Sequence, residues 1–111
     1  MRERRAYVHE AELLLADGAD SHAPGGAVTV ALCGRWDHEG VCRWPHNSAI
    51  EVHGTRARLR TVFAAPPDEE DEVRIRIDEG LATGDWRVVT KRARPVSQDE
   101  RVLAAQLLSL E

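Results

Sequence analysis

The chain has 111 residues, of which 42% are hydrophobic and 31% are charged, and its formal net charge is −4. This balance predicts one globular domain over residues 1–111 that folds on its own core without a metal or disulfide staple. The acidic charge disfavours nucleic-acid binding, which needs a basic stripe, and no apolar run is long enough to cross a membrane.

The basic N-terminal residues are not followed by the apolar segment of a secretory signal, because His9, Glu10 and Glu12 interrupt it. We therefore expect a cytoplasmic protein. Disulfides are rare in the reducing cytoplasm, so a stable bond between Cys33 and Cys42 is not expected.

Residues 6–15 carry two patterns. Their Ala, Glu and Leu content favours a helix, whereas the alternation of Tyr7, His9, Ala11 and Leu13 favours a strand. We predict a strand, because the sheet that follows needs a neighbour. Gly18–Gly26 has the composition of a loop.

Three further strands are predicted between residues 27 and 64. Residues 27–35 alternate Val28, Val30 and Leu32 on one face. Residues 47–52 and 56–64 form a hairpin around His53-Gly54-Thr55. In its second arm Ala57, Leu59 and Phe63 share one face, and Arg56, Arg58 and Arg60 share the opposite face, which we expect to contact water.

The second half of the sequence is predicted to form two helices separated by a strand. Two prolines and an acidic run at 66–71 are typical of a helix start, the pairs Glu70–Arg74 and Glu72–Arg76 have helical spacing, and Gly84 would end the helix. Residues 85–96 return as a strand. Ser97 and Glu100 form a capping box, which starts a C-terminal helix with an apolar face. That face would dock on the domain or meet a partner. Its members are Val102, Leu103, Leu107, Leu108 and Leu110.

The predicted order is therefore β-β-β-β-α-β-α. It indicates an α+β fold with a mostly antiparallel sheet of about five strands and two helices packed on one face.

The segment from Cys33 to His46 concentrates the residues that carry chemistry and supports two interpretations. Cys33, His38, Cys42 and His46 are good zinc ligands, so one interpretation is a zinc-binding loop. However, the chain lacks the closely spaced ligand pairs, such as Cys-x2-Cys, that common zinc-binding motifs contain.

The second interpretation is a hairpin that turns at Asp37-His38-Glu39-Gly40. It puts Trp36, Cys42, Trp44 and His46 on one apolar face and Cys33 on the other. The two sulfurs could then neither bridge nor share an ion. We favour the hairpin, because turn chemistry and apolar alternation agree.

No phosphate-binding glycine loop, nucleophile elbow or zinc-protease motif is present, and an enzyme is the less favoured class. Thiol catalysis by Cys42 with His46 as base is a further alternative, although four residues along a strand separate them by about 13 Å.

The leading hypothesis is a small non-catalytic binding or interaction module that requires no cofactor and can form a homodimer. Its partner would be a protein, a second copy or a small ligand. The residues predicted to make those contacts are Trp36, Trp44, His46, Leu107 and Leu110.

Overall fold

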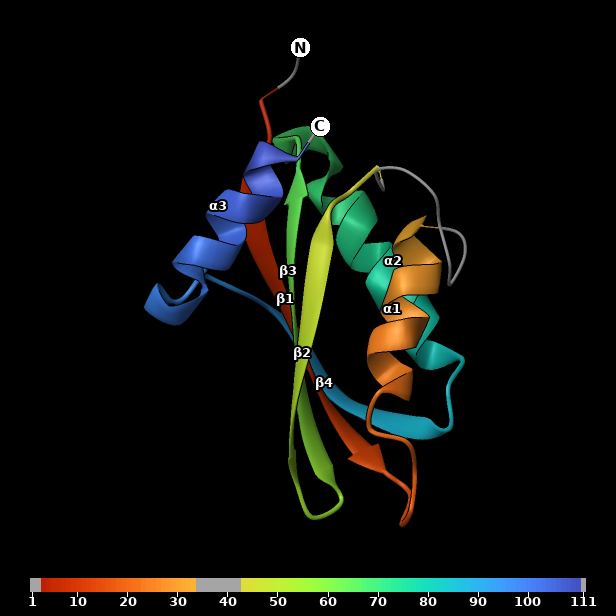
Figure 1. The fold of residues 1–111 in the computed structure, drawn as a ribbon. Coiled ribbons are helices and arrows are strands. Elements are labelled where there is room, and N and C mark those ends of the chain that lie inside the picture. The colour runs from red at the N-terminus through yellow and green to blue at the C-terminus, as the bar shows by residue number, and fades with distance from the viewer. Residues whose placement is uncertain (1–2, 34–42, 111) are drawn as a thin grey trace.

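A computed structural model describes residues 3–33 and 43–110. Four strands and three helices follow one another along these residues (Figure 1). They are β1 (Arg5–Leu15), α1 (Ala23–Cys33), β2 (His46–His53), β3 (Arg56–Ala65), α2 (Glu70–Ala82), β4 (Trp86–Arg94) and α3 (Arg101–Ser109). Short 3-10 turns at Pro67–Glu69 and Gln98–Glu100 lead into α2 and α3. None of these helices is long and apolar enough to cross a membrane.

The strands form one antiparallel sheet in the order β2-β3-β1-β4. Each helical crossover, β1-α1-β2 and β3-α2-β4, joins two parallel strands that have one other strand between them. Two such interleaved units make the split β-α-β topology of ferredoxin-like folds. The prediction of an α+β fold with an antiparallel sheet is confirmed, although the sheet has four strands and the helices number three.

The main core lies between the sheet and the pair α1 and α2. Every second residue of β3, including Ala57, Leu59 and Phe63, points into it, as the alternation predicted. Three residues of α2 meet them at helical spacing: Val73, Ile77 and Leu81. Gly80 lets the two helices approach closely, since a Cβ there would lie 2.8 Å from the Cβ of Ala31.

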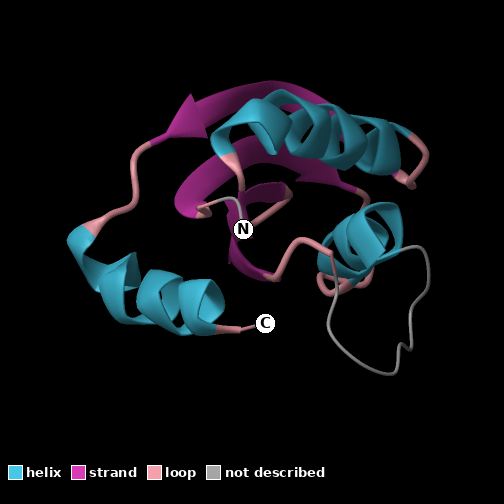
Figure 2. Ribbon diagram, turned by 90° about the horizontal axis from the view of Figure 1, so that it is seen from above, coloured by secondary structure: helices cyan, strands magenta, loops and turns pink. Residues whose placement is uncertain are grey.

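The third helix lies on the opposite side of the sheet, apart from α1 and α2 (Figures 1 and 2). Its buried residues Ala104 and Leu107 pack against Val8, Val62 and Ala64. The C-terminal helix therefore docks on its own domain, but Val102, Leu108 and Leu110 of its predicted apolar face are exposed. The prediction that both later helices cover one face is wrong, because β1 and β3 present apolar residues on both faces at this end of the sheet.

The largest correction concerns residues 27–35, which were predicted as a strand. Through Cys33 they are helical, and the buried residues Pro24, Val28 and Leu32 recur every four positions. Val30, which the strand interpretation placed beside Val28, is 45% exposed. The predicted hairpin of this segment with the residues up to His46 is consequently wrong, and His46 pairs with Phe63 of β3. The predicted turn at 37–40 lies outside the described residues.

Several local predictions are confirmed by the backbone. The hairpin of β2 and β3 turns at Gly54, whose φ of 66° suits the first central position of a type II′ turn. Ser97 and Glu100 form the predicted capping box, and the pairs Glu70–Arg74 and Glu72–Arg76 are ion pairs. The end of α2 differs, because Thr83 rather than Gly84 is its C-cap.

Candidate functional site on the open face of the sheet

We call the face of the sheet opposite α1 and α2 the open face. The register places six arginines and three glutamates of the strands on it. They are Arg56, Arg58, Arg60, Arg87, Arg92, Arg94, Glu10, Glu12 and Glu51. Helix α3 covers the apolar end of this face and leaves the charged part uncovered. The chain carries a net negative charge, so this concentration of arginine is a local feature of the fold.

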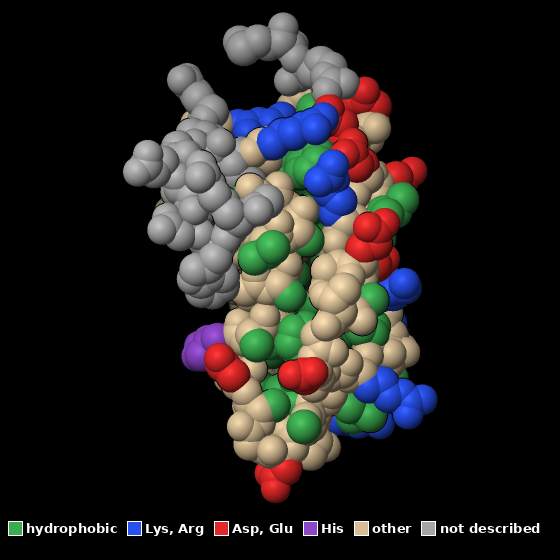
Figure 3. All heavy atoms as spheres, turned by 90° about the vertical axis from the view of Figure 1, so that its right-hand side faces the viewer, with side chains coloured by type: hydrophobic (Ala, Val, Ile, Leu, Met, Phe, Trp, Pro, Cys, Tyr) green, Lys and Arg blue, Asp and Glu red, His purple; other side chains and the backbone are tan. Residues whose placement is uncertain are grey.

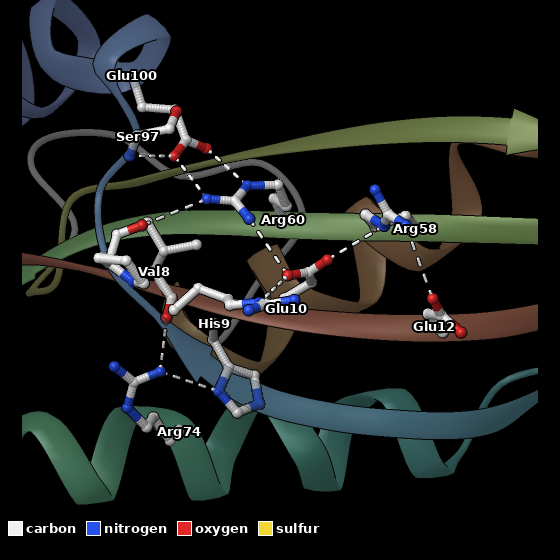
Figure 4. A network of polar contacts seen from close by, with 11 residues as sticks. Val8, His9, Glu10, Glu12, Arg58, Arg60, Arg74, Ser97 and Glu100 are labelled. Carbon is white, nitrogen blue, oxygen red and sulfur yellow. Dashed lines mark hydrogen bonds and ion pairs between the residues drawn. The ribbon is translucent and has the colours of Figure 1, made fainter.

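Glu10 lies at the centre of the charged part, in the middle of β1 (Figure 4). Its side chain is 7% exposed and is surrounded by three guanidinium groups. The contacts are 3.1 Å to Arg58, 3.2 Å to Arg60 and 2.9 Å to Arg94. A carboxylate at this depth needs such partners, because burial of an unpaired charge costs several kcal/mol.

Arg60 links this cluster to α3 (Figure 4). Its guanidinium donates two hydrogen bonds to Glu100, at 3.0 and 2.7 Å. Glu100 also accepts from the backbone N–H of Ser97 at 3.0 Å. The hydrogen bond from Arg60 is the main cause that lowers the pKa of Glu100 from 4.5 to about 2. The start of α3 is therefore tied to the sheet by an ionised carboxylate.

This pKa predicts an acid-sensitive attachment of α3. A carboxyl group whose pKa is lowered on folding stabilises the fold fully above its unfolded pKa, and loses that contribution as the pH falls through the folded value. The difference in the free energy of unfolding between wild type and Glu100→Gln should accordingly shrink as the pH falls from about 5 to 2. Urea unfolding across that range measures the gap. Asp99→Asn, at the exposed neighbouring position, should show a small and constant gap, and a constant gap for Glu100→Gln would contradict this role.

A hollow of about 180 Å³ opens on the same face at the end of the β2–β3 hairpin. Its charged lining comes from Glu12, Glu51, Arg56 and Arg58, with His53 beside them. Arg58 is shared by Glu10 and Glu12, and Nε2 of His53 lies 3.2 Å from Glu51. Within the described part of the chain Arg56 makes no ion pair, so its guanidinium is available to a ligand.

The helix-covered side of the molecule offers a weaker candidate. Figure 3 looks onto this side, where hydrophobic side chains are scattered among acidic and basic ones. A larger but more open depression between α1 and α2, of about 620 Å³, includes Glu72 and Arg76 in its lining. These two charges neutralise each other at 3.0 Å. We therefore take the hollow on the open face as the candidate site.

Trp44, predicted to contact a partner, is part of the main core. Its side chain is 1% exposed, its indole N–H donates to Glu69 at 2.8 Å, and the guanidinium groups of Arg43 and Arg76 lie over the ring at 4.5 and 5.0 Å. Every part of the ring is thus occupied by the protein itself.

His46 and Cys33 come together between α1 and β2. The sulfur of Cys33 lies 4.0 Å from Nδ1 of His46, which also lies 3.0 Å from the carbonyl oxygen of Trp44. A carbonyl only accepts, so Nδ1 donates to it and is not free to act as a base. The predicted strand geometry, which separated the two sulfurs, fails because Cys33 ends a helix.

The other predicted contact residues are scattered. Leu107 is buried on the face of α3 that packs against the sheet, and Leu110 is 46% exposed beyond the end of the helix. Trp36, His38 and Cys42 lie outside the described residues. Among the residues that are described, no group of three His, Cys, Asp or Glu side chains is arranged to hold a metal ion.

His9 and Asp78 form a polar pair that the sequence did not reveal. Nε2 of His9 lies 2.7 Å from the carboxylate of Asp78, and Arg74 lies 3.1 Å from Nδ1. Arginine only donates, so Nδ1 accepts and the Nε2 proton is donated to Asp78. Lys91 lies 3.6 Å from the second oxygen of Asp78. With His9 only 5% exposed, the pair fixes α2 to the sheet.

No protein-family model matches the chain, and no curated protein matches its sequence. Ferredoxin-like folds carry many unrelated activities, so the topology alone does not assign one. The inference of function therefore rests on the hollow and on the arginines around it. One signal in the sequence indicated this face: arginines alternate at the start of β3, and Arg58 and Arg60 lie opposite Glu12 and Glu10 of β1.

Proposed function

We propose that the chain is a non-catalytic binding module that holds a small anionic ligand in the hollow on the open face. The observation that carries this proposal is the position of Arg56, an exposed arginine on the hollow that no described acidic group neutralises. A guanidinium offers a planar pair of donors that matches a carboxylate or a phosphate. The apolar side chain of Val89, 44% exposed, supplies a second contact for the ligand.

The size of the hollow limits the ligand. About 180 Å³ is less than the roughly 300–1,000 Å³ of pockets that bind drug-sized molecules. A short carboxylic acid or a single phosphate group matches this volume better than a nucleotide. Glu12 and Glu51 on the lining would repel a ligand with several negative charges.

Binding is favoured over catalysis by the state of the groups that could act as nucleophile or base. His9 has both ring nitrogens engaged by Asp78 and Arg74. The ring nitrogen of His46 that faces the sulfur of Cys33, Nδ1, donates to the carbonyl oxygen of Trp44 and is therefore not a base for a thiol. The zinc loop and the cysteine enzyme therefore gain no support from the described residues.

The proposal is tested with propionate, a short monoanionic carboxylate, and inorganic phosphate as probes. At a free concentration ten times its dissociation constant, an anion that binds the folded protein should raise the melting temperature by roughly 5 °C. Arg56→Ala should weaken the binding measured by calorimetry about tenfold or more.

Arg87→Ala is the matched control, because Arg87 lies on the open face but does not line the hollow. It should leave the affinity unchanged. The proposal fails if neither probe binds at millimolar concentration, or if both variants lose the same affinity and the effect is merely that of net charge.

A further inference from the structure

The two edge strands of the sheet, β2 and β4, are protected to very different degrees. An edge strand exposes unpaired backbone N–H and C=O groups, and proteins protect it with charged side chains, proline or bulges. Strand β4 carries Arg87, Lys91, Arg92 and Arg94, and its register with β1 shifts at Glu12/Leu13. This edge is therefore guarded by charge and by irregular pairing.

Strand β2 has neither protection. Its sequence from His46 to His53 contains Glu51 as its one carboxylate, with no lysine, arginine or proline, and its register with β3 is unbroken. Its second half is exposed, and Val52 is 43% exposed although it is apolar. Among the described strands only β3 pairs with it.

The hairpin geometry determines which backbone groups of β2 point outward. The two-residue turn Gly54-Thr55 makes His53 and Arg56 the closing pair, and such a pair is hydrogen-bonded. Hydrogen-bonded pairs alternate along an antiparallel ladder, so the N–H and C=O groups of Ser48, Ile50 and Val52 point away from β3. Among the described residues no other backbone group pairs with these donors and acceptors, which are regularly spaced along β2.

We propose that β2 pairs antiparallel with β2 of a second copy, so that two four-stranded sheets join into one. A two-fold axis perpendicular to the sheet keeps the helices of both copies on the same side. With the axis at Ile50, the two Ile50 side chains meet and Ala49 lies opposite Glu51 of the other copy. With the axis at Ala49, Glu51 lies opposite Asn47. Neither register places Glu51 against itself, so the strand is compatible with its own copy.

The test is the oligomeric state in solution, measured by sedimentation equilibrium over a range of concentrations. The wild-type chain should be a dimer. Ala49→Asp adds a charge at an exposed position of β2 and should raise the dimer dissociation constant roughly tenfold. Both registers bring a like charge against the new carboxylate, either Glu51 or the same substitution in the second copy, and symmetry repeats the contact.

Ala93→Asp is the control, because it makes the same change at an exposed alanine on the other edge strand. It should leave the dimer intact, and circular dichroism should confirm that both variants fold. Ala49→Lys then distinguishes the registers, since it strengthens the dimer centred on Ile50 and weakens the one centred on Ala49. A monomeric wild type, or a dimer that Ala49→Asp leaves unchanged or that Ala93→Asp dissociates equally, overturns the proposal.

Discussion

Replacing Glu10 by alanine is expected to lower the free energy of unfolding by about 2–4 kcal/mol, as measured by urea denaturation at neutral pH. The carboxylate is the common partner of Arg58, Arg60 and Arg94. Without it, three guanidinium groups are left close together with no charge between them. Their mutual repulsion and the lost hydrogen bonds both act against the folded state.

The expected loss is below that of a fully buried ion pair because the arginines reach water. The side chains of Arg58 and Arg94 are 52% and 46% exposed, so solvent hydrates them after the change. Arg60 is 25% exposed and also holds Glu100. The effects of Glu10→Ala and Glu100→Ala should therefore not add, since Arg60 contacts both carboxylates.

Glu12→Ala is the matched control for this prediction. Glu12 lies on the same strand and face, but it is 34% exposed and its one described ion pair, with Arg58, spans 3.8 Å. Its loss should cost less than about 0.5 kcal/mol. Glu10→Gln, which retains hydrogen-bonding capacity without the charge, should fall between the two. Equal effects of Glu10→Ala and Glu12→Ala would show that the charge at the centre of the face is not special.

The sequence predicted the structure correctly where the local pattern of a segment agrees with its place in the tertiary structure. Strand β3 alternates arginine and apolar residues from Arg56 to Arg60, and its inner face is buried as predicted. The capping box at Ser97 and the ion pairs of α2 depend only on spacing within a few residues, and both are present. Such features need no knowledge of the remaining chain.

Helix α1 was missed because its local preference and its environment conflict. Two glycines and the β-branched residues Val28, Thr29 and Val30 disfavour a helix. The main core nevertheless requires a cover over β2 and β3, and the spacing of Pro24, Val28 and Leu32 supplies it. Tertiary packing decided this element, as it commonly does when the intrinsic preference is weak.

The candidate site could not be predicted from the sequence, for a different reason. The contacts of Glu10 depend on the strand order, which brings β1 between β3 and β4 and so places Arg58, Arg60 and Arg94 around one carboxylate. The hollow likewise draws its lining from all four strands. Periodicity reveals which face a residue occupies but not which strand lies beside it.

Trp44→Ala is expected to cost about 3–5 kcal/mol, the range for removing a large buried aromatic side chain. The ring is 1% exposed and belongs to the main core, and its N–H is bonded to Glu69. Trp44→Phe retains most of the apolar volume and loses the hydrogen bond, so it should cost about 1–2 kcal/mol. Urea denaturation of the three proteins measures both differences.

These variants also separate a core role for Trp44 from the partner contact that the sequence suggested. A core residue changes the unfolding free energy in proportion to the volume removed, and it leaves anion binding by the folded protein unchanged. Val102→Ala, at a side chain 72% exposed on α3, serves as the surface control and should change stability by less than about 0.5 kcal/mol. The opposite result would be a Trp44→Phe variant that is as stable as wild type yet no longer binds a partner. The ring would then have to leave the core to make that contact. Its burial against Glu69, Arg43 and Arg76 would describe only the unbound state.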